Sequence, residues 1–191
     1  MRPSKRSKVL QAALQLAGDV GIRGLTIDAV AAEAGLTKAG VLYHFSHRDD
    51  LITAVLDHIA DSWEEQVTEA LGTHPDQGTA TDRVIAFATA AATTPPQSAE
   101  LAVLIDAMRY EHSRGRWRAL VRRWTDDPDQ PLSTEQRIAL LAADGLWLNN
   151  TTASTDLSPE EHQATLNRIR EMSAMRRPAW KHPTIQMNRG V

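Results

Sequence analysis

The sequence predicts an all-helical protein, in which an N-terminal helix-turn-helix domain of three helices precedes a C-terminal helical bundle. Apolar residues recur at intervals of three and four, and no long stretch alternates between polar and apolar residues. Alanine is abundant, β-branched residues rarely cluster, and glycine, proline and capping residues separate the helical segments. Together these features favour helices over strands.

The first two predicted helices are short amphipathic segments. Apolar residues share one face over Ser4–Val20, and Gly21 interrupts that pattern. Thr26 is a good N-cap for the second helix, Ile27–Ala34, because its hydroxyl can accept a hydrogen bond from a free backbone N–H group. Gly35 stands where a left-handed residue commonly ends a helix.

The third helix, predicted over Lys38–His44, follows the second after the turn Gly-Leu-Thr. Thr37 is its N-cap, and Ala31 and Ala32 are small enough to let neighbouring helices pack closely. Two short helices joined in this way form a helix-turn-helix, whose second helix enters the major groove of DNA by its N-terminal end.

Six further helices are predicted in the rest of the chain. Each has an apolar face, and a capping residue, a proline or a polar loop marks its ends. They are predicted over Asp49–Leu71, Ala80–Thr93, Ser98–His112, Arg116–Thr125, Ser133–Asn150 and Ser158–Arg177. We accordingly divide the chain into a head, residues 1–47, a body, residues 48–178, and a flexible tail, residues 179–191.

Length and composition limit the class of protein. The 191 residues suffice for one or two domains with a substantial core. There is no cysteine, which excludes disulfides, thiolate metal sites and a cysteine nucleophile. No apolar run approaches the ~20 residues that span a bilayer, and the basic N-terminal segment lacks the apolar core of a signal peptide. We therefore expect a cytoplasmic protein with no membrane partner.

The net charge of −3 hides an uneven distribution. Residues 1–50 contain seven Lys and Arg against five Asp and Glu, whereas residues 51–191 contain fourteen against nineteen. A basic head on an acidic body suits contact with a polyanion at one end of the molecule only.

The candidate DNA-binding residues lie near the N-terminus, at the two threonine caps and along the third helix. They are Lys5, Thr26, Thr37, Lys38, Ala39, Gly40, Tyr43 and His44. Most can bind phosphates or base edges, and Ala39 can touch a thymine methyl group. The alternative is that Thr37 only caps a helix and that Tyr43 and Phe45 are core aromatics, which we favour for Phe45 but not for Tyr43.

The run LTIDAVAAEAGLTKAGVLYHFSHRDDLITAVL strongly resembles the DNA-binding segment of TetR-type repressors. The shared pattern is a capping Thr, Ala-x-x-Ala-Gly, a short helix ending in an aromatic residue, His or Tyr and Phe, and a charged start to the fourth helix. The match covers residues 5–56 without a gap. The segments ADSWEEQV, LIDA and AADGLW also resemble multidrug-binding repressors of that family.

The resemblance implies a homodimer that binds a palindromic double-stranded operator, with a cavity for a small-molecule inducer in each C-terminal domain. It implies a repressor of a multidrug efflux gene, released by small planar cationic aromatic compounds. The alternatives are an activator, or a regulator of metabolic genes with an acyl or other small-molecule inducer. The chain departs from these relatives in its tail, its Arg-rich segment 109–123 and Asn149-Asn150.

The body also carries tryptophans among small residues, an arrangement that leaves space for a planar ligand. Asp106 and Asp144 lie within apolar helices and would favour cationic ligands, to which tryptophan faces add cation–π attraction. The candidate ligand-binding residues are Trp63, Val67, Phe87, Ala91, Leu104, Ile105, Asp106, Met108, Asp144 and Trp147. The alternative is that the tryptophans fill a core and both acids form local contacts.

The last two helices are predicted to pair two subunits, since Gly145 permits close approach and apolar residues surround it. The candidate interface residues are Leu141, Gly145, Leu166, Ile169 and Met172.

Three other features have simpler interpretations. The arginines of segment 109–123 are expected to form a solvated face paired with Asp126, Asp127 and Asp129, rather than a second nucleic-acid surface. His44 and His47 lack a third ligand, so we expect no metal and no cofactor. No nucleophile motif or phosphate-binding loop is present, so we expect no enzymatic activity.

Overall fold

The computed structural model describes residues 4–94, 98–107 and 111–175. Throughout these ranges the secondary structure is helical and no strand occurs, which confirms the predicted all-helical class. The predicted tail and the candidate ligand residue Met108 lie outside the described residues.

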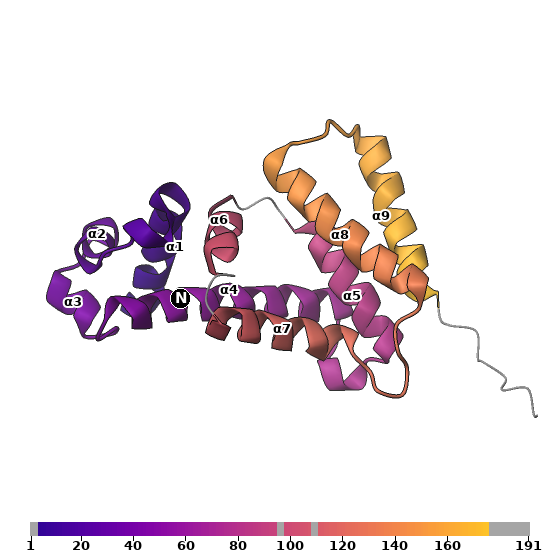
Figure 1. Cartoon of the computed structure of the whole chain (residues 1–191), viewed down its shortest axis with the longest axis horizontal. Coiled ribbons are helices and arrows are strands. Elements are labelled where there is room, and N and C mark those ends of the chain that lie inside the picture. The colour runs from indigo at the N-terminus through magenta and orange to yellow at the C-terminus, as the bar shows by residue number, and fades with distance from the viewer. Residues whose placement is uncertain (1–3, 95–97, 108–110, 176–191) are drawn as a thin grey trace, which may run out of the picture.

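The head consists of α1 (Lys5–Gly24), α2 (Ile27–Glu33) and α3 (Lys38–Leu42), at one end of an elongated molecule (Figure 1). Gly21 interrupts α1 as predicted: its φ of 73° is not helical, and the chain kinks there before a short helical segment continues to Gly24. Helix α3 ends two residues earlier than predicted, at Leu42.

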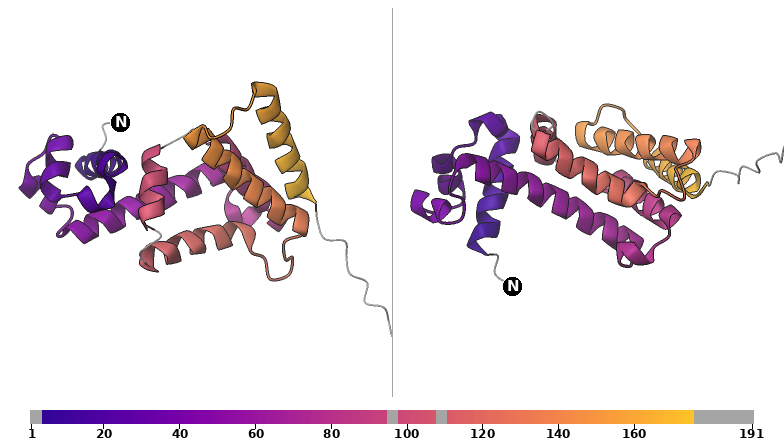
Figure 2. Two further views of the ribbon diagram at one scale, coloured as in Figure 1. Left: turned by 45° about the horizontal axis from the view of Figure 1, so that its top comes forward. Right: turned by 60° about the horizontal axis from the view of Figure 1, so that its bottom comes forward.

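The body is built on one long helix, α4 (Arg48–Leu71), which runs from the head along the length of the molecule (Figures 1 and 2). Helices α5 (Ala80–Thr93) and α7 (Glu111–Thr125) pack against α4 and against each other. Helices α8 (Thr134–Thr152) and α9 (Pro159–Ala174) form an antiparallel pair that covers α5. A short 3₁₀ turn, η1 (Pro75–Gln77), connects α4 to α5.

Helix α6 (Ser98–Ala107) stands between the head and the body, where it packs against α1, α4 and α8 (Figure 1). The contact with α1 is close: a Cβ atom added to Gly18 would lie 2.4 Å from Cβ of Ala99. The absence of a side chain at Gly18 therefore lets the two helices approach backbone to backbone. Helix α6 is therefore in direct contact with the head.

Several boundaries in the body differ from prediction, and the helix predicted over Ser98–His112 is given as α6 only to Ala107. Helix α7 begins at Glu111 rather than at Arg116, because Ser113 and Gly115 are accommodated within the helix. Helix α8 continues to Thr152, where Ala153 adopts a left-handed φ of 47° as its cap. Among the described residues, no helix is both long and apolar enough to cross a membrane.

Candidate functional site

The predicted DNA-binding residues are all exposed or half-buried on the head. Lys5, Thr26, Thr37, Lys38, Ala39 and Tyr43 are exposed, and Gly40 and His44 are half-buried. Tyr43 is 85% exposed, so its ring is not part of the core. By contrast Phe45 is 4% exposed and packs in the core beneath the Arg6 guanidinium, as the alternative interpretation held for this residue.

Two threonine caps shape this surface. The hydroxyls of Thr26 and Thr37 accept hydrogen bonds from the backbone N–H groups of Ala29 and Gly40, both at 3.1 Å. A Cβ atom at Gly40 would lie 3.3 Å from the Thr37 hydroxyl, so glycine leaves room for the cap. Thr37 is thus a cap and is exposed as well, which means that one residue can position α3 and face a binding partner.

Lys38 forms an ion pair with Asp28 of α2, with Nζ 2.9 Å from the carboxylate. Both side chains are more than half exposed, at 59% and 70%. Exposed ion pairs of this kind contribute less than about 1 kcal/mol, so Lys38 can exchange Asp28 for a phosphate or a base edge at little cost.

Arg48 joins the head to the body, a role that the sequence analysis missed. Its guanidinium donates hydrogen bonds to the carbonyl oxygens of Leu25 at 2.6 Å, Ile22 at 2.5 Å and Arg23 at 3.3 Å. These carbonyls stand at the end of α1, where helices leave acceptors unsatisfied. Arg48, the first residue of α4, therefore fixes this helix to the head.

Three tryptophans meet inside the body. The ring of Trp63 on α4 lies 5.9 Å from that of Trp117 on α7 and 5.7 Å from that of Trp147 on α8, both edge to face. Trp63 and Trp147 are 4% and 9% exposed, and neither indole N–H has a hydrogen-bond partner. The sequence analysis had left Trp117 out of this group. We call these three residues the tryptophan cluster.

The other predicted ligand residues divide into two sets. Val67, Phe87 and Ala91 are buried in the same core as the cluster, and Leu104 packs against it. Ile105 is 61% exposed and does not face the core, since it lies on the opposite side of α6 from the buried residues.

The two predicted acids have different surroundings. Asp106 faces α1, where its carboxylate would lie 3.7 Å from a Cβ atom added to Gly21. Desolvation raises the pKa of Asp144, yet that residue is exposed on the outer face of α8. Because an exposed residue remains open to water, we assign Asp144 to the surface.

The acid that is buried is Glu100, on α6, which the sequence analysis missed. It is 4% exposed, its Oε2 atom has no hydrogen-bond partner, and burial raises the pKa of its carboxyl group. A signal existed in the sequence: Glu100 precedes Val103 and Leu104 by three and four residues, which places it on the apolar face of its helix.

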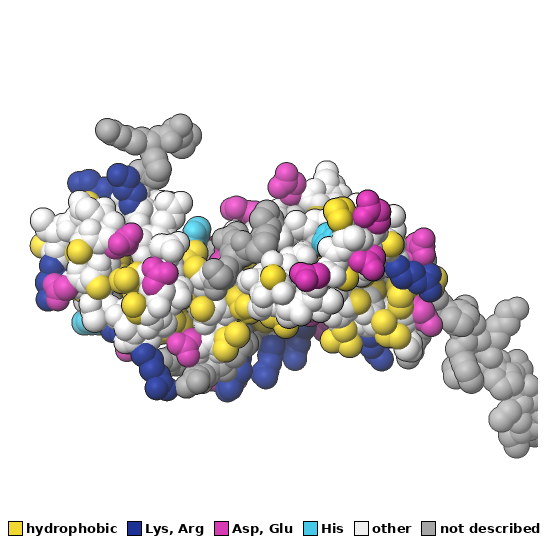
Figure 3. Space-filling view, turned by 90° about the horizontal axis from the view of Figure 1, so that it is seen from above, with side chains coloured by type: hydrophobic (Ala, Val, Ile, Leu, Met, Phe, Trp, Pro, Cys, Tyr) yellow, Lys and Arg dark blue, Asp and Glu magenta, His cyan; other side chains and the backbone are white. Residues whose placement is uncertain are grey.

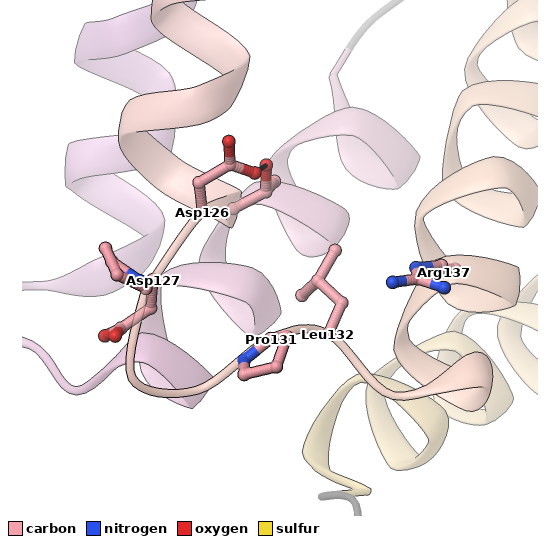
Figure 4. A pocket seen from close by; sticks show the side chains of 7 residues that line it. Asp126, Asp127, Pro131, Leu132 and Arg137 are labelled. Carbon is pink, nitrogen blue, oxygen red and sulfur yellow. Dashed lines mark hydrogen bonds between the residues drawn. The ribbon is translucent and has the colours of Figure 1, made fainter.

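Three cavities lined by described residues lie apart from the tryptophan cluster. One, of about 360 Å³, follows α7, with Asp126 and Asp127 on one side and Arg137 on the other (Figure 4). A second of about 250 Å³ adjoins Leu71, and a third of about 400 Å³ lies on the head beside Lys8. Within the described part of the chain no group of three or more His, Asp or Glu side chains is placed to hold a metal.

The predicted dimer residues also divide into two sets. Leu141 is 71% exposed and Gly145 is exposed, and with Ile138 and Leu148 they form one stripe of α8. Leu166 and Ile169 are 5% and 2% exposed because they pack against the body of their own chain. Met172 is half-buried against the same core.

The arginines of α7 pair mainly with acids of α4, not with the predicted loop. Arg116 lies 2.7 Å from Asp61 and 3.9 Å from Asp57, and Arg123 lies 2.5 Å from Glu64. Basic side chains form a row along the edge of the body where α7 lies, and others gather at the head (Figure 3). The α7 row is therefore partly neutralised by acids.

Two family models match the chain. Bacterial regulatory proteins of the tetR family match over residues 9–55, which span most of the head and the start of α4. The tetracyclin repressor-like C-terminal domain matches over residues 78–174, which span α5 to α9.

Curated relatives match over a short part of the chain. The transcriptional regulator RutR of Escherichia coli K12 is 35% identical over 60 residues, which cover 31% of this chain and 28% of RutR. The regulator BetI of Brucella anthropi is 29% identical over 72 residues, which cover 38% of this chain and 37% of BetI. The aligned segments thus span about a third of these relatives.

Solved structures match over nearly the whole chain. A TetR-family member from Streptomyces coelicolor is 24% identical with a TM-score of 0.58, covering 87% of this chain and 98% of that one. The multidrug binding protein EbrR, solved with malachite green, is 24% identical with a TM-score of 0.58, covering 89% of this chain and 98% of EbrR. At these identities the likeness shows a common fold.

Proposed function

Because the chain belongs to the TetR family of bacterial regulatory proteins, we propose that it is a repressor that binds a palindromic operator as a homodimer. The observation that carries this proposal is the surface of the head. All eight candidate DNA-binding residues are exposed or half-buried there, and two threonine caps position them. A helix-turn-helix presents the start of its second helix to the major groove, so Lys38 and Ala39 are the residues that read bases.

The stripe of α8 supports the homodimer. Ile138, Leu141 and Leu148 are 48%, 71% and 45% exposed, and such a row of apolar side chains favours contact with a second copy. A Cβ atom at Gly145 would meet nothing within 4 Å in one protomer, so space remains for close approach. Pairing through this stripe would place two heads on successive turns of DNA, ~34–36 Å apart.

The inducers in this proposal are small planar aromatic cations, and the regulated gene encodes a multidrug efflux system. Support comes from the tryptophan cluster, whose rings could stack on a planar ligand and attract a cation. The rings touch one another in this structure, so a ligand has to separate them. Trp63 lies on α4 about 22 Å from Arg48 at 1.5 Å per residue, so its displacement could shift the head. The ligand need only bind the shifted state more tightly.

Operator binding can be measured by fluorescence anisotropy with a labelled duplex from the region upstream of the chain's own gene. We expect tight binding that weakens steeply with salt, because basic residues release counterions from phosphates. Lys38→Ala and Tyr43→Ala should each weaken binding by about 1–3 kcal/mol. Arg168→Ala, on exposed α9, is the matched control and should leave affinity unchanged. If both head variants bind like the wild type, the DNA-binding surface lies elsewhere.

The homodimer can be tested by sedimentation velocity at micromolar protein concentration. Gly145→Arg and Leu141→Glu should yield folded monomers, since both positions are exposed in one protomer. A wild-type monomer under these conditions would contradict the proposal, and dimeric variants would place the interface elsewhere.

A further inference from the structure

Glu100 is a buried acid without a hydrogen-bond partner. The residue is 4% exposed, and its Oε2 atom accepts no hydrogen bond. In the described part of the chain, no Lys, Arg or His forms an ion pair with it. Burying a charged carboxylate without a partner is costly, so such groups become neutral or bind a donor. Burial raises the pKa of Glu100, as this argument requires.

Glu100 lies on α6, the helix that contacts both helices carrying the buried tryptophans Trp63 and Trp147. It shares a face of α6 with Val103 and Leu104, which stand three and four residues further on. Val103 is fully buried in the same core cluster as Trp63 and Trp147, and Leu104 packs against it.

The unpaired atom that calls for a donor or a positive charge is Oε2 of Glu100. Native cores rarely leave a buried polar atom unpaired, so this oxygen indicates a missing donor or cation. Trp63 and Trp147 contribute the faces of their rings. Aromatic faces and one carboxylate together match a flat ring system that carries a positive charge.

We infer that Glu100 is the anionic contact that selects a planar aromatic cation in the body of this protein. This inference rests on the proposed inducer class. It makes Glu100, instead of Asp106 or Asp144, the residue that selects positively charged ligands. Ala99, the preceding residue, touches Gly18 of α1. A cation held by Glu100 therefore acts on α6 beside its closest contact with the head.

The test compares two ligands of one shape at pH 8, where N-methylacridinium is a permanent cation and acridine is neutral. Isothermal titration calorimetry without DNA measures both affinities. The wild type should prefer the cation, and Glu100→Gln should weaken cation binding about tenfold or more while acridine binding stays unchanged. Asp106→Asn and Asp144→Asn are matched controls and should keep the preference.

A second measurement needs no variant. Cation binding by the wild type should weaken at acidic pH as Glu100 takes up a proton, since N-methylacridinium keeps its charge. The inference is overturned if Glu100→Gln keeps the preference, if the preference follows Asp106 or Asp144, or if wild-type binding shows no such pH dependence. If the wild type binds neither compound yet binds its operator, the inference about Glu100 fails while the DNA-binding proposal stands.

Discussion

The head and the body of this chain differ in how completely their buried polar side-chain atoms are paired, because the unpaired ones found among the described residues lie in the body. In the head, the hydroxyls of Thr26 and Thr37 accept hydrogen bonds from backbone N–H groups, and three carbonyl oxygens accept hydrogen bonds from Arg48 at the start of α4. In the body, Oε2 of Glu100 and the indole N–H groups of Trp63 and Trp147 are buried without a hydrogen-bond partner.

This difference separates two tasks. A surface that binds DNA benefits from rigidity, because side chains already held in place lose less conformational entropy on binding. A core that responds to a ligand needs a second packing arrangement of similar free energy. Buried polar atoms without partners destabilise the arrangement in which the tryptophan rings touch, and so they bring the free energies of the two arrangements closer together. The predictions below test this contrast, beginning with the largest effect.

The largest effect is expected in the body, from Trp63→Ala. The ring is 4% exposed and contacts two other tryptophans, so its removal should cost about 3–5 kcal/mol of unfolding free energy. Urea denaturation measures this loss. The folded fraction should still bind the operator, because the DNA-binding residues are far away. Loss of operator binding by folded Trp63→Ala would show that the two regions are not separable.

In the head, Arg48→Ala should cost about 1.5–3 kcal/mol of stability, the range for hydrogen bonds that involve a charged group. Operator affinity should fall too, because α1 loses its attachment to α4. Arg48→Lys is the informative control: one ammonium cannot match three carbonyl oxygens, so it should recover only part of both losses. If Arg48→Lys recovers the full stability and operator affinity, the positive charge at this position is sufficient and the three hydrogen bonds of the guanidinium are not needed.

Gly18→Ala tests the contact between the two regions. The added Cβ atom would come within 2.4 Å of Ala99, which forces α1 and α6 apart and should cost about 1–3 kcal/mol. Chemical denaturation reports the cost. The double variant with Ala99→Gly should recover part of it, and Ala12→Gly, elsewhere on α1, controls for helix propensity. An unaltered stability in Gly18→Ala would indicate that α6 does not press on the head.

The smallest effect concerns pH. Burial raises the folded-state pKa of Glu100, so the folded chain holds this proton more tightly than the unfolded chain. The resulting stabilisation is fully present below the unfolded pKa and is lost as the pH rises through the folded pKa. The Glu100→Gln variant should not lose stability as the pH rises through this range. Its free energy of unfolding at neutral pH should therefore exceed that of the wild type. Exposed Glu65→Gln should not, and equal pH profiles of wild type and Glu100→Gln would contradict a buried, unpartnered carboxylate.

The head could be predicted from sequence because its signals are local. The caps Thr26 and Thr37 accept the hydrogen bonds expected of them, and Gly35 has the positive φ, 63°, that its turn requires. Each of these depends on residues within four positions along the chain. Arg48 escaped prediction because its acceptors lie more than twenty residues away.

The body was harder because its contacts are long-range. Helical periodicity located the buried face of α4, including Trp63, since that helix has one apolar side. Helix α6 packs on three neighbours, so its apolar residues do not mark one buried face and Ile105 could not be recognised as exposed. The spacing of Glu100 from Val103 and Leu104 did indicate the burial of that acid. For Leu166 and Ile169, an apolar face fitted either a partner subunit or the core of the same chain, and only the packing of α9 on α5 decided between them.

The most direct test asks whether a ligand held in the body moves the heads. The chain has no cysteine, so Ala32→Cys on exposed α2 gives one spin label per protomer. Double electron–electron resonance then measures the separation of the two heads in the dimer, without DNA. We predict that saturating N-methylacridinium changes the distance distribution and that the same concentration leaves it unchanged in Glu100→Gln. An unchanged distribution in the wild type, or an equal change in both proteins, would contradict control of the head through Glu100.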